Sequence, residues 1–162
     1  MATTHIITFN QLMRLFKQFQ TSHPQLNDFD YGQTYDIGTS RVMQFPYMWA
    51  TSEIDSTIQV TNKVVQPFEN LTILLCDKIN EQRNILNSNG ENSCNGQEVI
   101  SDMKLIALDL VTEIVNNWGQ YGVSIEGDVP TFVVSDETDD KVNGVGIRLT
   151  LKEKYLNCEI PL

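Results

Sequence analysis

The stretch that decides the fold is Val142 to Leu162, which reads VNGVGIRLTLKEKYLNCEIPL. Its first half alternates four aliphatic residues with small or polar ones: Val145, Ile147, Leu149 and Leu151. This period of two is typical of a β-strand with one face on a hydrophobic core and the other toward solvent. We therefore predict a strand that inserts beside strands formed earlier in the chain and closes the sheet.

The alternation ends before a short apolar tail, residues 156–162. Pro161 has no backbone N–H, so the tail cannot continue inside a sheet and needs another surface to cover it. We predict that it docks, either within its own subunit or on a neighbouring one. The candidate oligomer-interface residues are Asn157, Cys158, Glu159, Ile160, Pro161 and Leu162.

Length and charge narrow the class of protein. A chain of 162 residues predicts a single domain, residues 1–162, and 41% hydrophobic residues are ordinary for a globular fold. Eleven Lys and Arg against twenty-one Asp and Glu give a formal net charge of -10. Phosphate backbones and anionic membranes attract clustered cations, so this balance disfavours a protein that reads nucleic acid or binds membranes.

Cysteine usage and the N-terminal sequence predict a soluble protein that is made where it works. Cys76, Cys94 and Cys158 are odd in number and far apart, which suits reduced thiols in a cytosol, and no pair has metal-ligand spacing. The N-terminal residues show no cationic leader followed by an apolar core, and no run reaches the ~18 apolar residues of a membrane span.

Two helices follow from periodicity. Apolar residues at helical spacing predict a first helix over about residues 8–21, which His23-Pro24 ends. Its aromatic stripe, Phe9 to Phe19, has two interpretations: packing on the protein's own sheet, or a surface that holds a partner helix. A second, longer helix is predicted over about residues 97–118, with Gly119 as its C-terminal stop, and it should be the main cover of the sheet.

The strands are predicted around these helices. Residues 27–37 indicate a loop entering a short strand, and alternation over residues 43–49 indicates another, with Pro46 at an edge or bulge. A twisted strand or hairpin arm is expected over 57–65, a central strand buried on both faces over 68–77, and short strands over 121–125 and 131–135. A flexible loop is expected at about residues 80–96. This order predicts an α+β domain with a mostly antiparallel sheet.

No motif indicates catalysis, so we expect no enzyme activity, no cofactor and no metal. His5 and His23 have no recognisable motif around them, and Cys76 falls in a strand that should be buried. An acidic turn consists of Asp136, Glu137, Asp139 and Asp140. It has three interpretations: calcium ligands without the EF-hand pattern, a solvated turn that keeps strand edges apart, or the lining of a channel in a ring of subunits.

The order of elements resembles a family of small virion proteins from tailed bacteriophages, especially crAss-like and related phages. The likeness rests on four features: a helical N-terminus, the aromatic strand QFPYMWATSE (44–53), the passage from LTILLCDKINE (71–81) to EVISDMKLIALDLVTEIV (98–115), and the closing strand with its C-x-I-P-L ending. These proteins are head–tail connectors or tail-completion proteins of the tail-terminator type. The chain departs from them in its Asn-rich segment, 84–95, and at Glu159.

The resemblance implies a tail-terminator-like fold and a structural subunit without catalytic residues. Such a subunit forms a homo-oligomeric ring at the neck or the top of the tail, contacts other neck and tail proteins, and is assembled in the bacterial cytoplasm. DNA passes through its channel without specific binding, and no membrane is involved. The alternative function is a cytosolic adaptor or assembly chaperone that uses the N-terminal aromatic helix, and a small hydrolase or metal-dependent enzyme is a third class.

Overall fold

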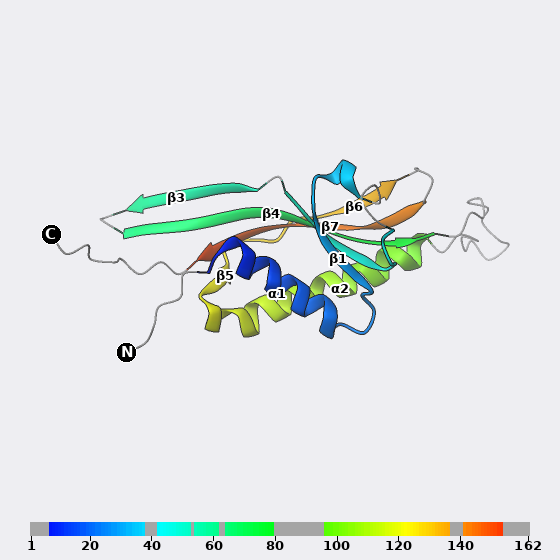
Figure 1. Ribbon diagram of the computed structural model, residues 1–162, viewed down its shortest axis with the longest axis horizontal. Coiled ribbons are helices and arrows are strands. Elements are labelled where there is room, and N and C mark those ends of the chain that lie inside the picture. The colour runs from blue at the N-terminus through cyan, green and yellow to red at the C-terminus, as the bar shows by residue number, and fades with distance from the viewer. Residues whose placement is uncertain are drawn as a thin grey trace.

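The computed structural model describes residues 7–37, 42–52, 54–61, 64–79, 96–136 and 141–153. Within these residues two α-helices cover one face of a seven-stranded sheet, as Figure 1 shows. This arrangement confirms the predicted α+β class with a helix-covered sheet. The loop expected at about residues 80–96 lies outside the described residues, apart from Gly96, which is the first residue of a helix.

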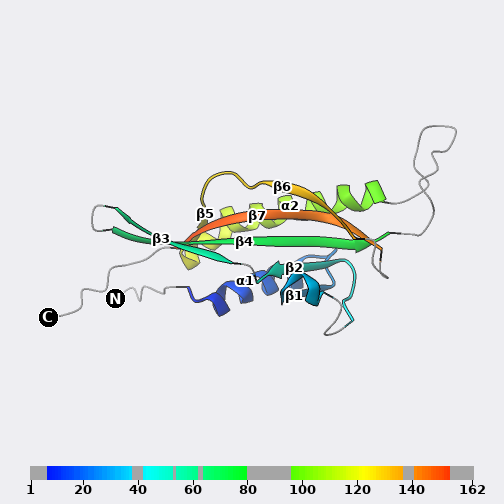
Figure 2. The ribbon, with the colours of Figure 1, turned by 90° about the horizontal axis from the view of Figure 1, so that it is seen from above.

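The sheet is mixed. Its central order is β1 (Asp28–Gly32), β2 (Tyr47–Thr51), β4 (Val64–Lys78), β7 (Val142–Glu153) and β5 (Val123–Ile125). Off this path, β3 (Asp55–Thr61) pairs with β4, and β6 (Thr131–Asp136) pairs with β7. Only the pairing of β1 with β2 is parallel among the described strands. Figure 2 shows β4 and β7 running side by side through the middle of the sheet.

The predicted closing strand is confirmed and is longer than the alternation alone indicates. β7 pairs with β4 from Lys152 opposite Phe68 to Val142 opposite Lys78, and it carries β5 and β6 on its other edge. Val145, Ile147 and Leu149 are buried against the helices. The strand therefore joins the two halves of the sheet, as its sequence pattern predicts.

Helix α1 (Phe9–Ser22) begins at a capping box. The Gln11 backbone N–H donates to Thr8 Oγ1 at 3.3 Å, and the Thr8 N–H donates to Gln11 Oε1 at 2.7 Å. This reciprocal pair satisfies two backbone donors at the helix start. The helix ends before His23, as predicted.

Helix α2 (Gly96–Asn117) ends differently from the prediction. Gly119 was expected to stop the helix, but the chain continues through a 3-10 turn, η2 (Trp118–Tyr121), and the left-handed residue is Gly122, with φ 80°. Burial of Trp118 gives the physical reason, since its ring packs edge-on against Phe16 with centroids 4.9 Å apart. The chain therefore stays coiled through Tyr121, which holds the Trp118 ring in the core, and reverses direction at Gly122.

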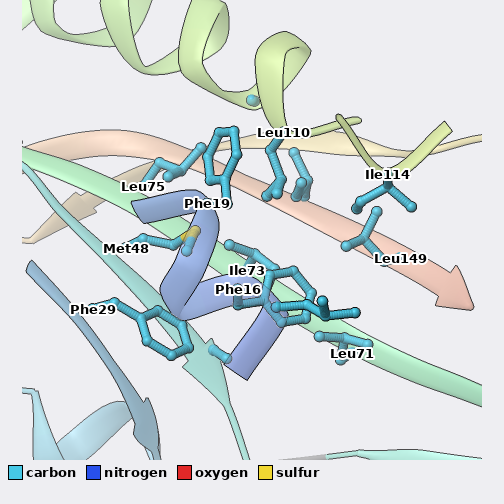
Figure 3. Packing of buried hydrophobic residues seen from close by; sticks show 14 of the residues in the cluster. Phe16, Phe19, Phe29, Met48, Leu71, Ile73, Leu75, Leu110, Ile114 and Leu149 are labelled. Atoms are coloured by element: carbon cyan, nitrogen blue, oxygen red, sulfur yellow. The ribbon is translucent and has the colours of Figure 1, made fainter. Parts of the chain in front are cut away.

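The core has two layers, one on each face of the sheet. Figure 3 shows Phe16 and Phe19 of α1 with Leu110 and Ile114 of α2 over the β4 residues of the helix-covered face. These β4 residues are Leu71, Ile73 and Leu75. On the opposite face a smaller cluster contains Met43, Tyr47, Trp49, Leu74, Cys76 and Val142. The prediction that this central strand is buried on both faces is confirmed.

Two of the short strands differ from their predicted bounds. β2 begins at Tyr47, although the alternation starts at Met43, because Pro46 cannot donate to the ladder. Met43 is still buried in the smaller cluster. Tyr121 belongs to η2, so β5 starts at Val123. A further 3-10 turn, η1 (Thr34–Asp36), follows β1.

Candidate interaction surfaces

The structure describes few of the residues that the sequence singles out for function. Asp136 is the last residue of β6 and pairs with Val142 of β7, so the acidic turn connects these two strands. Its other members, Glu137, Asp139 and Asp140, lie outside the described residues. The tail at 156–162, with the interface candidates Asn157 to Leu162, also lies outside them.

The first exposed surface is a two-stranded ribbon, which we call the arm: β3 together with residues 64–70 of β4. All seven residues of β3 are exposed, including Ile58 at 67% and Val60 at 70%. Because β7 pairs with β4 only from Phe68 onward, the outer part of the arm has no third strand among the described residues. Figure 1 shows the arm projecting beyond the ends of both helices. An isolated two-stranded hairpin is marginally stable in water, so a partner that covers the arm would stabilise it.

The apolar side of the arm continues the helix-covered face of the sheet. Ile58 lies opposite Pro67 on β4. Pro67 is an even number of residues from Leu71 and Ile73, so it lies on the same face of the sheet as these two residues, which pack under the helices. At the base of the arm the Ser56 hydroxyl donates to Glu69 Oε2 at 2.6 Å. In the body the helices cover this face, whereas neither of the two described helices packs on it along the arm.

The second exposed surface lies on the outward side of α2. Leu105, Leu108 and Val115 are 57%, 62% and 63% exposed, at spacings of three and seven residues that place them on one stripe of the helix. We call this set the α2 stripe. Val99, Met103 and Leu110, among others, form the opposite, buried side. The helix also carries four acids and one lysine: Glu98, Asp102, Asp109, Glu113 and Lys104.

The face of the sheet opposite the helices carries cations over aromatic rings. Arg148 lies 5.1 Å from the centroid of Phe132, Lys152 lies 6.0 Å from that of Phe68, and Lys78 lies 4.8 Å from that of Phe45. Such contacts stabilise by about 0.5–1 kcal/mol at exposed sites. These contacts could not be predicted from the sequence, because each pair joins residues from separate segments of the chain.

Gly146 explains how one of these rings comes to lie flat on the sheet. Phe132 of β6 is directly opposite Gly146 of β7, and a Cβ at Gly146 would overlap the Phe132 ring. The missing side chain lets the ring cover the strand, with Arg148 above it. Gly146 is therefore required by packing.

Two carboxyl groups have unusual surroundings. Burial raises the pKa of Glu153 to about 7, and the neighbouring charge of Glu69 adds to the rise. Burial also raises the pKa of Asp77; the Lys78 backbone N–H, which donates to it at 2.7 Å, opposes this, and Asp102 adds to it. Asp77 lies near one end of the paired strands β4 and β7, and Glu153 lies at the other end.

Groups with chemical reactivity are dispersed. His23 Nε2 lies 3.3 Å from Asp109 Oδ2, where it joins the end of α1 to α2, and Cys76 is a buried residue in the smaller cluster. In the part of the chain that the structure describes, no three His, Cys, Asp or Glu side chains gather as a metal site. The surfaces that stand out among these residues are suited to binding.

Comparison of the chain with models of known protein families gives no match, and comparison with curated proteins gives none either. Neither of the two described helices is long and apolar enough to cross a membrane.

Proposed function

We propose that this chain is a structural virion protein of a tailed bacteriophage, a tail-terminator-like subunit that forms a ring at the neck or the top of the tail. The observation that carries the proposal is the arm, with Ile58 and Val60 exposed on a ribbon that projects from the body. Monomeric proteins rarely expose contiguous apolar patches larger than roughly a few hundred Å², and patches above that size mark interaction sites. The element order of the resembling phage proteins, a helix, strands, a long helix and closing strands, agrees with the order seen here.

The charge of the chain suits a channel through which DNA passes. A net charge of -10 repels phosphates, whereas a basic lumen would release counterions and hold the DNA. In this proposal the acidic turn, Asp136 to Asp140, faces the channel. A ring structure whose channel surface is neutral or basic would contradict this assignment.

The C-terminal tail, Asn157 to Leu162, completes the proposal as a docking segment. It is apolar and short, and in the proposed ring it contacts either its own subunit or the next one. Other neck and tail proteins of the virion would bind the faces of the ring.

The experiment is size-exclusion chromatography with light scattering on the full chain, followed by negative-stain electron microscopy of the largest species. We expect a single oligomer with a central channel. The same measurement on mixtures with neighbouring virion proteins should show co-elution. A chain that stays monomeric at every concentration and binds no virion protein would refute the proposal.

The alternative function, a cytosolic adaptor or assembly chaperone, requires an exposed aromatic stripe on α1. Leu12, Phe16 and Phe19 are buried in the protein's own core, as the packing interpretation of the stripe predicts. Phe9 is partly exposed and packs edge-on against Tyr31, with centroids 6.0 Å apart. An adaptor would therefore need a surface other than this stripe.

A further inference from the structure

We infer that the arm of one subunit docks on the α2 stripe of a second copy of the chain. The inference rests on the proposed ring and names the contact that builds it. Both surfaces are apolar and exposed, and they lie on different elements, so one subunit can offer its arm while receiving its neighbour's arm on α2.

The shape of the arm favours a helix as its partner. In the body, the strand face that carries Leu71, Ile73 and Leu75 is covered by α2 and α1. On the arm, the same face carries Ile58 and Val60, which are 67% and 70% exposed, and neither described helix covers them. A helix with an apolar stripe would complete this face as α2 completes it in the body, because strand and helix surfaces of this kind bury each other.

The helix that fits is α2, and it must come from another copy. Its buried side already packs on β4 and β7, so the α2 stripe points away from its own sheet. The arm cannot fold round to reach that side, because its second strand is the outer end of β4, which runs straight into the middle of the sheet (Figure 2). Only the arm of another molecule can reach the stripe.

Charge supports the same partner. Two copies that each carry -10 repel one another wherever their acids meet. Between Asp55 and Glu69 the sequence has no acid, and its one charged residue is Lys63. The outer part of the arm, between its base residues Asp55 and Glu69, is therefore an acid-free segment of an acidic protein, and it meets a helix with four acids and one lysine. Apolar burial and a modest electrostatic attraction act together at this contact.

The contact is heterologous, since two different patches of the same chain meet. Each subunit uses both patches, so the contact can repeat around a ring or along a filament, and the proposed ring requires that each arm reaches a new subunit. Reciprocal exchange of arms between two subunits would instead give cross-linked dimers without larger species. The repeating contact thus gives the proposed ring a specific geometry: every arm reaches over the long helix of the next subunit.

Cysteine cross-linking of the full chain tests the inference, in a background with Cys94→Ser and Cys158→Ser that keeps the buried Cys76. Because Cys158 belongs to the proposed docking tail, light scattering must first give the same oligomer for this background as for the natural chain. Chains carrying Ile58→Cys together with one of Leu105→Cys, Leu108→Cys or Val115→Cys are oxidised and run on a denaturing gel. We expect at least one pair to give a ladder of dimers, trimers and larger species. The matched control pairs the same α2 cysteine with Gln59→Cys, on the opposite face of the arm, and should give no ladder.

The outcomes separate the two proposals. Oligomers by light scattering with no ladder from any pair would overturn the arm contact and leave the ring standing. Monomers throughout, with no ladder, would overturn both. Dimers from Ile58→Cys alone would overturn the heterologous contact, because they would show arms pairing with arms.

A second measurement uses Ile58→Asp, with Val133→Asp on the exposed edge strand β6 as the matched control. We expect Ile58→Asp to raise the subunit concentration needed for assembly at least about tenfold, while lowering the melting temperature of the monomer no more than Val133→Asp does, since Asp is disfavoured in any strand. Assembly that is unaffected would overturn the inference. A melting temperature lowered clearly more than by Val133→Asp would also overturn it, since Ile58 would then be covered within its own chain.

Discussion

The carboxyl of Glu153 lies at the end of β7, buried beside β5, with only 7% of the residue exposed. Burial raises its pKa from the ordinary 4.5 to about 7, and Glu69 contributes a further repulsion. In the unfolded chain the group keeps its ordinary pKa, so between about pH 4.5 and 7 the folded state holds the proton more tightly. The contribution of Glu153 to the free energy of unfolding is therefore most favourable below this window and falls as the pH rises through it.

The size of this effect follows from the pKa. Each pKa unit corresponds to about 1.4 kcal/mol, which gives roughly 3 kcal/mol at full burial. Water still reaches part of the residue, so we expect about 1–2 kcal/mol. Substitution Glu153→Gln removes the ionisable group while keeping the shape of the side chain. The difference in unfolding free energy between the variant and the natural chain should therefore increase by about 1–2 kcal/mol, in favour of the variant, as the pH is raised from 5 to 8.5.

Urea unfolding at a series of pH values measures the difference directly, at a dilution where light scattering shows one species. The contributions of the other acids cancel when the two chains are compared. Glu126→Gln is the matched control, because Glu126 is exposed and 4.0 Å from Lys152; its effect should stay within about 0.5 kcal/mol at every pH. Glu69→Gln should reduce the pH dependence in part. A difference between Glu153→Gln and the natural chain that does not change with pH would refute the reasoning.

Two further predictions concern packing and the tail. Gly146→Ala should destabilise the fold by about 1–3 kcal/mol in urea unfolding, because the new Cβ overlaps the Phe132 ring. Adding Phe132→Ala should relieve that overlap, and strictly additive effects in the double variant would contradict the packing argument. Deleting Asn157 to Leu162 should leave the domain folded by circular dichroism, since β7 remains, but should weaken assembly in light scattering. Loss of folding would instead assign the tail to the subunit's own core.

The sequence predicts best those elements whose hydrophobic period is long and unbroken. β7, β4 and α2 were all identified from spacing, and their buried faces are the predicted ones. Boundaries were less accurate where tertiary packing decides them. Gly119 follows the last periodic residue of the helix, but burial of Trp118 carries the chain on to Gly122 before it reverses.

The exposed surfaces could not be predicted in the same way. Helical spacing assigns Ile106 to the buried side of α2 and leaves Leu105 and Leu108 off it, but it does not show whether another element covers these two residues; in the structure both are exposed. The exposure of the arm depends on where β7 stops, at Glu153, relative to the hairpin of β3 and β4. Contacts such as Arg148 over Phe132 depend on register between strands, which sequence spacing does not contain.

The position of β7 in the chain bears on how the protein is made. β7 is the shared partner of β4, β5 and β6, yet it follows all of them in the sequence. During synthesis, then, one long edge of β4 stays unpaired until β7 leaves the ribosome. One strand of the arm is formed by residues 64–70 of β4. This order would therefore delay stable subunit contacts until the whole chain can fold. A chain stalled before Lys141 should thus remain sensitive to protease across β4 to β6, and resistance at that stage would contradict this order of events.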